Sequence, residues 1–578
     1  MPADILELRN PFLCQVLKRC GEYHNGISVT YNKLDIKAMI ERVLLVSLIL
    51  GINNYVFSQT QIIGKVIDAK NASPLAYVNI GINERSMGTV SKEDGSFAIV
   101  IPFGYQTDSL TFSMVGYYES SRSIRDLAEA GNVIVRLEVK TTQLEEVLIA
   151  GEELVAKRYG IKSRGAIHFT DGIFKKDDSF EIGQVIHLGN YPAKVTSVNF
   201  HINSSRPDSA IFRINFYRYD EEENTPKERI IDKSILQSHP VNEGWLKLNL
   251  SDSNIIITGS VLVSIEFIPE TRKDVDQLFY EVKIGGSSKS FFRETSLGQW
   301  TRPPHHYCIY VIAITNKNAP DEDGDEETVP THTLTSDFSS EAYSLFVNLP
   351  PDYSKDNEKI YPVIYLLDGN VYFDPVVHSV VSYTKKKNIS ADPIVVGIGY
   401  ENAYIMDSLR NRDYTFPKAL PSDSFKLSGQ GDKFYDFIKK RIVSYIDSTY
   451  RTDKTNRTIM GHSLGGYFVL YALTRDLAGV SVFNNFIAAS PSIYYHDNYL
   501  IKELGDSSKH TRNLEGINLY MTMGALEVLE NQCSDFEQMS MILTNRKIRI
   551  HTEIYKNIGH MGTAIPTFEN GIRLFMNN

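Results

Sequence analysis

Hydrophobic and polar residues follow two different rhythms along the chain. Up to about residue 316, short alternating runs such as 194–202 recur, and turn residues such as Asp94-Gly95 separate them. A period of two is typical of strands with one solvated face, and Asp-Gly provides the positive φ of a tight hairpin. Further along, the nearly continuous apolar run 393–400 and the helical period over 433–450 indicate buried parallel strands and amphipathic helices.

The pattern predicts a multidomain chain: two all-β sandwich domains, then an α/β domain whose mostly parallel sheet is covered by helices on both faces. We expect six segments in all. From the N-terminus these are a mis-assigned leader (1–38), a signal peptide (39–58), a first β-sandwich (59–150), a second, jelly-roll-like β-sandwich of unknown function (155–316), an acidic linker (317–330) and the α/β domain (331–578).

The segment 39–58 has the features of a secretory signal. Arg42 precedes an apolar run of about ten residues, which is too short to span a bilayer, and Val56 and Ser58 occupy the −3 and −1 positions before Gln59. The 38 residues ahead of it are polar and without clear period, so we interpret Met39 as the true start. We therefore expect an exported protein that is periplasmic, associated with the outer membrane or extracellular, with no transmembrane span in the mature chain.

Charge and cysteine content exclude several functions. The 578 residues have a formal net charge of −10, and no block is rich in lysine or arginine, which argues against nucleic-acid binding. The four cysteines show no C-x-x-C spacing, so no zinc or redox site is expected. His305 and His306 are interpreted as part of an exposed turn, because no third metal ligand is in view. We expect no metal and no organic cofactor.

The chemistry is predicted at a strand-to-helix junction. Gly461-His462-Ser463-Leu464-Gly465 fits G-x-S-x-G, the nucleophile elbow. The serine must sit on a sharp turn that lifts its hydroxyl clear of the sheet, and the residues two before and two after it must be small to avoid collision. The helix that follows points its N-terminus at the site, so the Leu464 N–H is a predicted oxyanion donor.

A serine hydroxyl needs a base that is held by an acid, and in this fold the chain order is Ser, then Asp or Glu, then His. Of the histidines after Ser463, we expect His560 to be the base, because it lies in a loop after the final strand. Glu527 is the favoured acid, since it enters a loop directly after a predicted strand. Glu530 and Asp535 remain open as alternatives.

The first β region resembles a known accessory module. Gly64-Lys-Val66-Ile-Asp68, Pro74 to Val78, Asp94 to Phe97 and Phe112 to Tyr117 look like the carboxypeptidase-regulatory-like domain. That resemblance implies a non-catalytic module of the kind found at the N-terminus of envelope proteins. It adds a possible association with the cell envelope to the expected partners.

The segment from about 335 to 577 resembles the esterase branch of the α/β-hydrolases, and within it the siderophore esterases of the enterobactin-hydrolase type. The motifs that carry the resemblance are Leu366 to Asn370, Arg410 to Thr415, Gly461 to Gly466, Ser490-Pro491-Ser492 and Gly559-His560.

The resemblance also implies roles for residues outside the elbow. The backbone at Gly369 and Asn370 would give the second oxyanion donor. The loop from Arg410 to Thr415 would border the acyl pocket. The implied substrate contacts are Arg410, Arg412, Tyr414, His462 and Tyr494.

Together these observations predict a secreted serine carboxylester hydrolase of siderophore-esterase type that acts through an acyl-enzyme. Its partner would be a small-molecule or glycan-linked ester. Two alternatives stay open: a carbohydrate esterase that acts on feruloyl or acetyl esters of a polysaccharide, and a non-catalytic envelope binding protein on the same fold.

Overall fold

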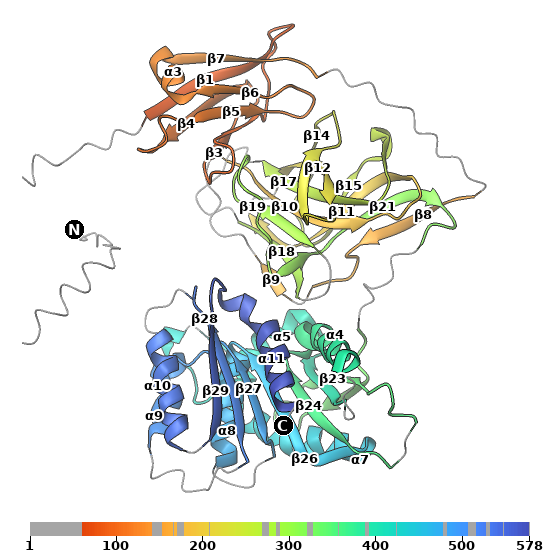
Figure 1. The fold of residues 1–578 in the computed structure, drawn as a ribbon, viewed down its shortest axis with the longest axis vertical. Coiled ribbons are helices and arrows are strands. Elements are labelled where there is room, and N and C mark those ends of the chain that lie inside the picture. The colour runs from red at the N-terminus through yellow and green to blue at the C-terminus, as the bar shows by residue number, and fades with distance from the viewer. Residues whose placement is uncertain are drawn as a thin grey trace, which may run out of the picture. The chain divides into compact units, whose positions relative to one another are not determined.

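The computed structural model describes most of the chain between Thr60 and Met576 (Figure 1). The described residues are 60–140, 153–165, 167–169, 178–206, 209–268, 277–284, 289–320, 328–355, 358–387, 392–423, 425–477, 482–506, 516–527, 532–546 and 548–576. The predicted leader, the signal peptide, residues 321–327 of the acidic linker and Glu530 lie outside them. Within these ranges, no helix combines the length and the apolarity needed to cross a membrane.

The first β region consists of two small sheets that face each other. One has the order β4 (Ser96–Ile101), β1 (Thr60–Asp68), β7 (Asn132–Leu137), and the other has the order β3 (Gly88–Val90), β2 (Asn79–Gly81), β5 (Ser109–Ser113), β6 (Ser120–Ser123). Phe97 of β4 meets Phe112 of β5 edge to face, with ring centroids 5.4 Å apart. The short helix α3 (Ile124–Ala130), which the sequence pattern did not predict, begins after Ser123, whose hydroxyl accepts the Asp126 N–H.

The second β region also pairs two sheets across one core. The first sheet has the order β13 (Thr225–Arg229), β12 (Ser209–Asp220), β17 (Ser260–Ile268), β10 (Phe180–His187), β19 (Ser290–Arg293), with β14 (Ile235–Pro240) on β12. The second has the order β20 (His305–Tyr307), β18 (Gln277–Ile284), β11 (Ala193–Arg206), β21 (Ile309–Asn316), β8 (Leu154–Gly160), with β15 (Gly244–Asn249) and β16 (Ile255–Ile257) on β11 and β9 (Ile167–Phe169) on β18. Phe200 of β11 and Phe212 of β12 meet across the core, with centroids 5.9 Å apart.

The interpretation of His305 and His306 as an exposed turn is wrong. Both belong to β20, which pairs with β18, and both are buried. Burial, followed by the proximity of His306, lowers the pKa of His305 to about 4. A Pro-Pro dipeptide ahead of two histidines suggested a turn, but the pairing of a distant strand decides that these residues are extended.

The α/β region contains one eight-stranded sheet. Its order is β22 (His332–Thr335), β23 (Ala342–Asn348), β25 (Ile394–Tyr400), β24 (Tyr361–Leu367), β26 (Thr452–His462), β27 (Asn485–Ala489), β28 (Asn518–Gly524), β29 (Arg549–Tyr555). The pairings from β25 to β29 are parallel, while β22 and β23 form an antiparallel edge. The mostly parallel sheet is therefore as the sequence predicted.

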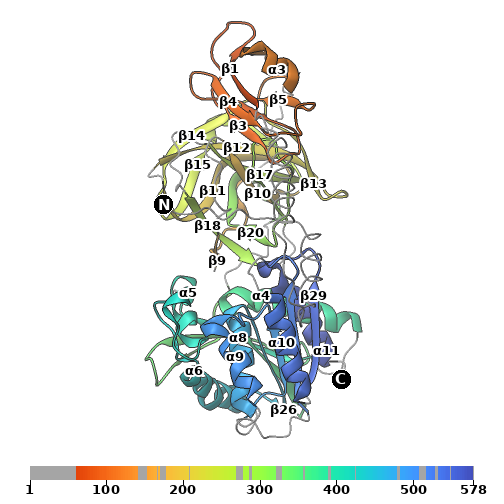
Figure 2. The same ribbon diagram turned by 90° about the vertical axis from the view of Figure 1, so that its left-hand side faces the viewer.

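Helices cover both faces of this sheet (Figure 2). On one face pack α5 (Ala403–Asp413), α6 (Gly431–Phe437), the π-helical turn η3 (Ile438–Ile442), α7 (Val443–Thr449), α8 (Leu464–Leu477), α9 (Tyr495–Gly505) and α10 (Gln532–Asn545). On the other face pack α4 (Gly369–Lys387) and α11 (Ala564–Met576). Side chains of neighbouring positions alternate between the two cores: Ile459 joins the first and Met460 the second. This arrangement brings the carboxyl ends of β24, β26, β27 and β28 to one edge, where loops can assemble a site.

Candidate active site

Ser463 occupies a strained turn between β26 and α8. Its φ is +60°, in the left-handed region that non-glycine residues rarely adopt. Ser463 is partly exposed, whereas His462 and Leu464 on either side of it are buried. The turn is held by the Ser463 N–H, which donates to Ala489 O at 3.0 Å, and by the Tyr467 N–H, which donates to Ser463 O at 2.9 Å. The hydroxyl is thus lifted from the sheet edge, as the motif predicted.

The predicted need for small residues beside the elbow is confirmed at Gly461. A Cβ on Gly461 would lie 2.6 Å from the backbone of Gly465, which is closer than real Cβ contacts come. At Gly465 a Cβ would lie 3.3 Å from Asp368 Oδ2, a tight but smaller conflict. The bend is sharp because the strand and the helix pass this close to each other.

Glu527 and His560 form a hydrogen-bonded pair beside the elbow. His560 Nδ1 lies 2.9 Å from Glu527 Oε2, and the His560 ring is 4.7 Å from the ring of His462, centroid to centroid. The Glu527 side chain is 4% exposed and that of His560 is 35% exposed. Ser463 Oγ has its hydrogen-bond contact with Ser492 Oγ at 3.5 Å, and in the described structure it makes no hydrogen bond to His560. Hydrogen bonds between a catalytic serine and its histidine are often long before substrate binds.

Glu527 is built to stay ionised. Burial opposes the charge, but hydrogen bonds from His560, from the Ser490 hydroxyl and from the Gly524 N–H outweigh it and lower the pKa of Glu527 below its ordinary 4.5. Ser490 Oγ donates to Oε1 at 2.5 Å, and the Gly524 N–H donates to the same oxygen at 2.6 Å. The carboxylate therefore presents its other oxygen to the imidazole. Asp535, the alternative acid, contacts Asn498 instead.

The predicted oxyanion donors come from two helix N-termini at the same edge of the sheet. Leu464 begins α8, and Gly369 and Asn370 begin α4, and the first N–H groups of a helix have no partner within it. The Asn370 side chain is fixed by reciprocal bonds with the backbone of Tyr400, at 3.0 Å and 2.7 Å. Its backbone is thereby held close to the end of β25.

Three of the predicted substrate contacts, Arg412, Tyr414 and His462, have side chains that are buried in the protein. Arg412 is buried against Asp413 and Tyr343, with its Nε 2.7 Å from Asp413 Oδ1. Tyr414 is fully buried, and its hydroxyl accepts the Asp368 N–H at 3.1 Å. His462 is 2% exposed. The contacts of Arg412 and Tyr414 within the protein hold this loop in place.

The two other predicted substrate contacts, Arg410 and Tyr494, differ from these three in their exposure or in their pairing. Arg410 is mostly buried and forms a bidentate pair with Asp368, with both N–O distances 2.9 Å. It therefore holds the loop that begins α4, and its charge is already matched. Tyr494 is 44% exposed and stays a predicted contact.

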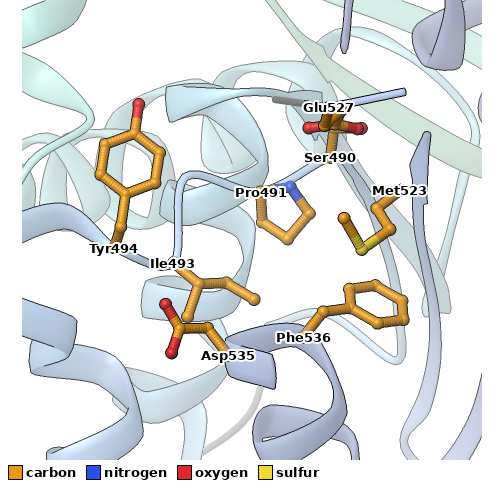
Figure 3. Close-up of a pocket in the computed structure, with 8 residues that line it drawn as sticks. All are labelled: Ser490, Pro491, Ile493, Tyr494, Met523, Glu527, Asp535 and Phe536. Carbon is orange, nitrogen blue, oxygen red and sulfur yellow. The ribbon is translucent and has the colours of Figure 1, made fainter. Parts of the chain in front are cut away.

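A small pocket that is partly open to solvent lies against the Glu527 side of the site (Figure 3). Its lining residues are Ser490, Pro491, Ile493, Tyr494, Met523, Glu527, Asp535 and Phe536. In Figure 3, Ser490 and Glu527 lie together at one end, and Asp535 lies on the opposite side, beyond Pro491 and Ile493. Among the described residues that line it, two are carboxylates and none is a lysine or arginine. The pocket is therefore mostly apolar with acidic groups at its ends.

Three groups that support the site were not predicted as site residues: Ser490, Thr563 and Tyr372. Ser490 Oγ bridges Glu527 and Thr563 Oγ1, the latter at 2.8 Å. Tyr372 contacts His462 from helix α4. The Ser-Pro-Ser motif was the available signal for Ser490, whereas nothing near Tyr372 in the sequence indicates a role. Across the described residues, no group of three His, Cys, Asp or Glu side chains could hold a metal ion.

Comparison with known proteins gives matches to both ends of the chain. The family model described as "Putative esterase" matches residues 338–563, and the CarboxypepD_reg-like domain matches residues 62–149. Over 255 residues the chain is 30% identical to the ferri-bacillibactin esterase BesA of Bacillus subtilis. The matched segment covers 42% of this chain and 86% of that relative. It is 29% identical over 141 residues to the apo-salmochelin esterase of Escherichia coli, covering 23% of this chain and 42% of that relative.

Two solved structures resemble part of the chain. The BES protein from Bacillus cereus has 23% identity and a TM-score of 0.38, covering 45% of this chain and 99% of that one. The enterobactin and salmochelin hydrolase IroE has 21% identity and a TM-score of 0.35, covering 43% of this chain and 94% of that one. With the elbow, the contact between Glu527 and His560, and a 30% identical relative matched over most of its length, the chain belongs to the siderophore-esterase-like branch of the esterase family and also carries a carboxypeptidase-regulatory-like domain.

Proposed function

We propose that this protein is a serine carboxylester hydrolase that works through an acyl-enzyme, with a siderophore ester as its substrate. The observation that carries the proposal is the His560 Nδ1 to Glu527 Oε2 contact of 2.9 Å, next to a serine on a left-handed elbow. Export is part of the proposal and rests on the signal-like segment 39–58.

The mechanism follows from the groups at the site. Ser463 Oγ attacks the ester carbonyl while His560 takes its proton, and the same imidazole then protonates the leaving alcohol. Glu527 holds the proton of His560 on Nδ1, so that Nε2 is the basic nitrogen. The Leu464 and Asn370 N–H groups stabilise the tetrahedral oxyanion, and one such donor contributes about 3–4 kcal/mol. In the second half of the reaction, water attacks the acyl-enzyme while His560 takes a proton from it. His560 then returns the proton to Ser463 Oγ as the acid leaves.

A polysaccharide ester is the second candidate substrate. Arg410 and Arg412 are both paired with aspartates, so neither offers a spare positive charge to an anionic catecholate. The pocket beside Glu527 carries carboxylates instead, which favours an uncharged ester such as a feruloyl or acetyl group. The curated relatives favour the siderophore, and the charge of the pocket favours the neutral ester.

The test is a hydrolysis panel run with the wild type and with Ser463→Ala. A metal-free triscatecholate trilactone, feruloylated xylan and acetylated xylan are the substrates, and a fluorophosphonate probe reports the nucleophile. We expect turnover and labelling of the wild type, and a loss of about 10⁶-fold in kcat with no labelling in Ser463→Ala. A wild type that neither turns over nor labels would leave the binding-protein alternative.

A further inference from the structure

His462 joins the nucleophile to the base through a single side chain. It is the last residue of β26 and is bonded directly to Ser463, and its ring is buried. His462 Nε2 lies 3.0 Å from the backbone carbonyl oxygen of His560. The two residues are 98 positions apart in the sequence, so this contact connects the elbow to the loop that follows the last strand.

The partners of His462 fix its tautomer. A carbonyl oxygen can only accept, so Nε2 must carry the proton that it donates to His560 O. In a neutral ring, Nδ1 is then an acceptor, and the Tyr372 hydroxyl donates to it at 3.0 Å. Burial, followed by the nearby His560 and Arg410, lowers the pKa of His462 well below 6.5, so the ring stays neutral. Burial raises the pKa of Tyr372, so its hydroxyl keeps its proton.

His560 O has a second contact, but that donor is shared. Thr563 Oγ1 lies 2.8 Å from His560 O and also 2.8 Å from Ser490 Oγ. Ser490 uses its own proton on Glu527, so the one proton of Thr563 serves either Ser490 or His560. Of these two side-chain donors, His462 is the one whose proton is not shared with Ser490.

A neutral His462 also suits the charge that develops during the reaction. The rings of His462 and His560 are 4.7 Å apart, and His560 becomes an imidazolium when it takes the proton of Ser463. A charged ring at His462 would oppose this step, whereas a neutral ring does not. The His560 side chain is 35% exposed, so its position depends on the few contacts that it makes.

We propose that His462 is a positioning residue for the base: its Nε2–H holds the backbone of His560 at a fixed distance from Ser463, and Tyr372 locks His462 in the tautomer that can do so. The proposal replaces the substrate contact predicted for His462 and rests on the proposed function. Small misplacements of a reacting group are costly, since about 1 Å can change a rate by about 10²-fold.

The experiment uses the full chain, with p-nitrophenyl acetate as the substrate. His462→Leu removes the donor and keeps an apolar side chain, His462→Gln keeps an amide N–H of similar reach, and Tyr372→Phe removes only the hydroxyl. For His462→Leu we expect kcat to fall about 10²-fold, with KM changed by less than about twofold, and fluorophosphonate labelling to slow in parallel. His462→Gln should recover most of the loss. Tyr372→Phe should lose about 10-fold, and the His462→Leu/Tyr372→Phe double variant should be no slower than His462→Leu.

The outcomes separate the possible roles. Wild-type kcat in His462→Leu, or additive losses in the double variant, would overturn the proposal. A merely structural histidine would lower the melting temperature in every variant without rescue by glutamine. If His462→Leu does not fold, then Tyr372→Phe decides alone: an unchanged kcat and labelling rate would overturn the proposal, and a drop in both at an unchanged melting temperature would support it. An inactive wild type would contradict the proposed function and not this inference in particular.

Discussion

Two buried carboxylates in different regions of the chain are both held by several hydrogen bonds, but their partners differ in exposure to solvent. Glu266, on β17 of the second β region, is fully buried and accepts hydrogen bonds from Arg213, Ser179 and Asn215. Glu527, after β28, is nearly as buried, and its last partner is His560, which is 35% exposed. Arg213 has a side chain that is 1% exposed and a fixed charge. The first network is closed, whereas the second ends on a group that can gain and lose a proton beside solvent.

The pKa shifts of the two carboxyl groups point in the same direction. In Glu266, burial opposes ionisation, but Arg213, Arg229 and Arg293 outweigh it and lower the pKa. In Glu527, burial is likewise outweighed, here by hydrogen bonds. A lowered pKa therefore does not by itself separate a structural acid from a functional one. The exposure of the partner differs between the two, since the Arg213 side chain is 1% exposed and that of His560 is 35% exposed.

Glu527→Gln is expected to have the largest effect on the reaction. The amide keeps the shape of the side chain but cannot hold the His560 proton on Nδ1 as a carboxylate does, so kcat should fall about 10⁴-fold with little change in stability. Steady-state kinetics with p-nitrophenyl acetate and thermal unfolding measure the two effects. A kcat within tenfold of the wild type would mean that the pair does not act in catalysis.

Glu266→Gln makes the same chemical change in the closed network and should have the opposite result. It leaves Arg213 buried without its countercharge, so we expect a loss of about 3–5 kcal/mol in the stability of the second β region. The kcat measured below the unfolding transition should equal that of the wild type. Urea unfolding, followed by tryptophan fluorescence from Trp245 and Trp300, reports this region. A loss of kcat in the folded variant would contradict the division into structural and functional acids.

Ser490→Ala is expected to have the smallest effect. It removes one charge-assisted hydrogen bond of about 1.5 kcal/mol from Glu527, so kcat should fall about 10-fold. Because the folded pKa of Glu527 is lowered, its ionisation adds stability above pH 4.5, and that stability is lost as the pH falls through the folded value.

In Ser490→Ala the pKa of Glu527 rises, so the difference in unfolding free energy between pH 7 and pH 4 should shrink. Urea unfolding at both pH values checks this expectation. The control is Ser492→Ala, which removes a nearby buried serine that contacts Ser463 and not Glu527. An equal change of this difference in both variants would contradict the role given to Ser490.

Local signals in the sequence located the elbow and the strands around it. The mostly parallel direction of the sheet followed from the alternation of strands and helices, whereas the strand order did not, and Ser463 followed from a five-residue motif whose geometry is nearly self-contained. The short helix α3 was missed, because seven residues give little periodic signal. Arg412 and Tyr414 were assigned to the substrate because they lie in a motif, but a motif does not state which way a side chain points.

The sequence by itself predicted where a serine elbow lies, which two groups could serve it, and that an α/β sheet carries them. Only the tertiary structure decided that Glu527 pairs with His560 while Asp535 bonds to Asn498, and that His462 contacts the backbone of His560. The reason is physical. A strained turn is a property of a few consecutive residues, whereas the direction of a buried side chain depends on partners such as Tyr372 and Arg410, which only the packed sheet brings near.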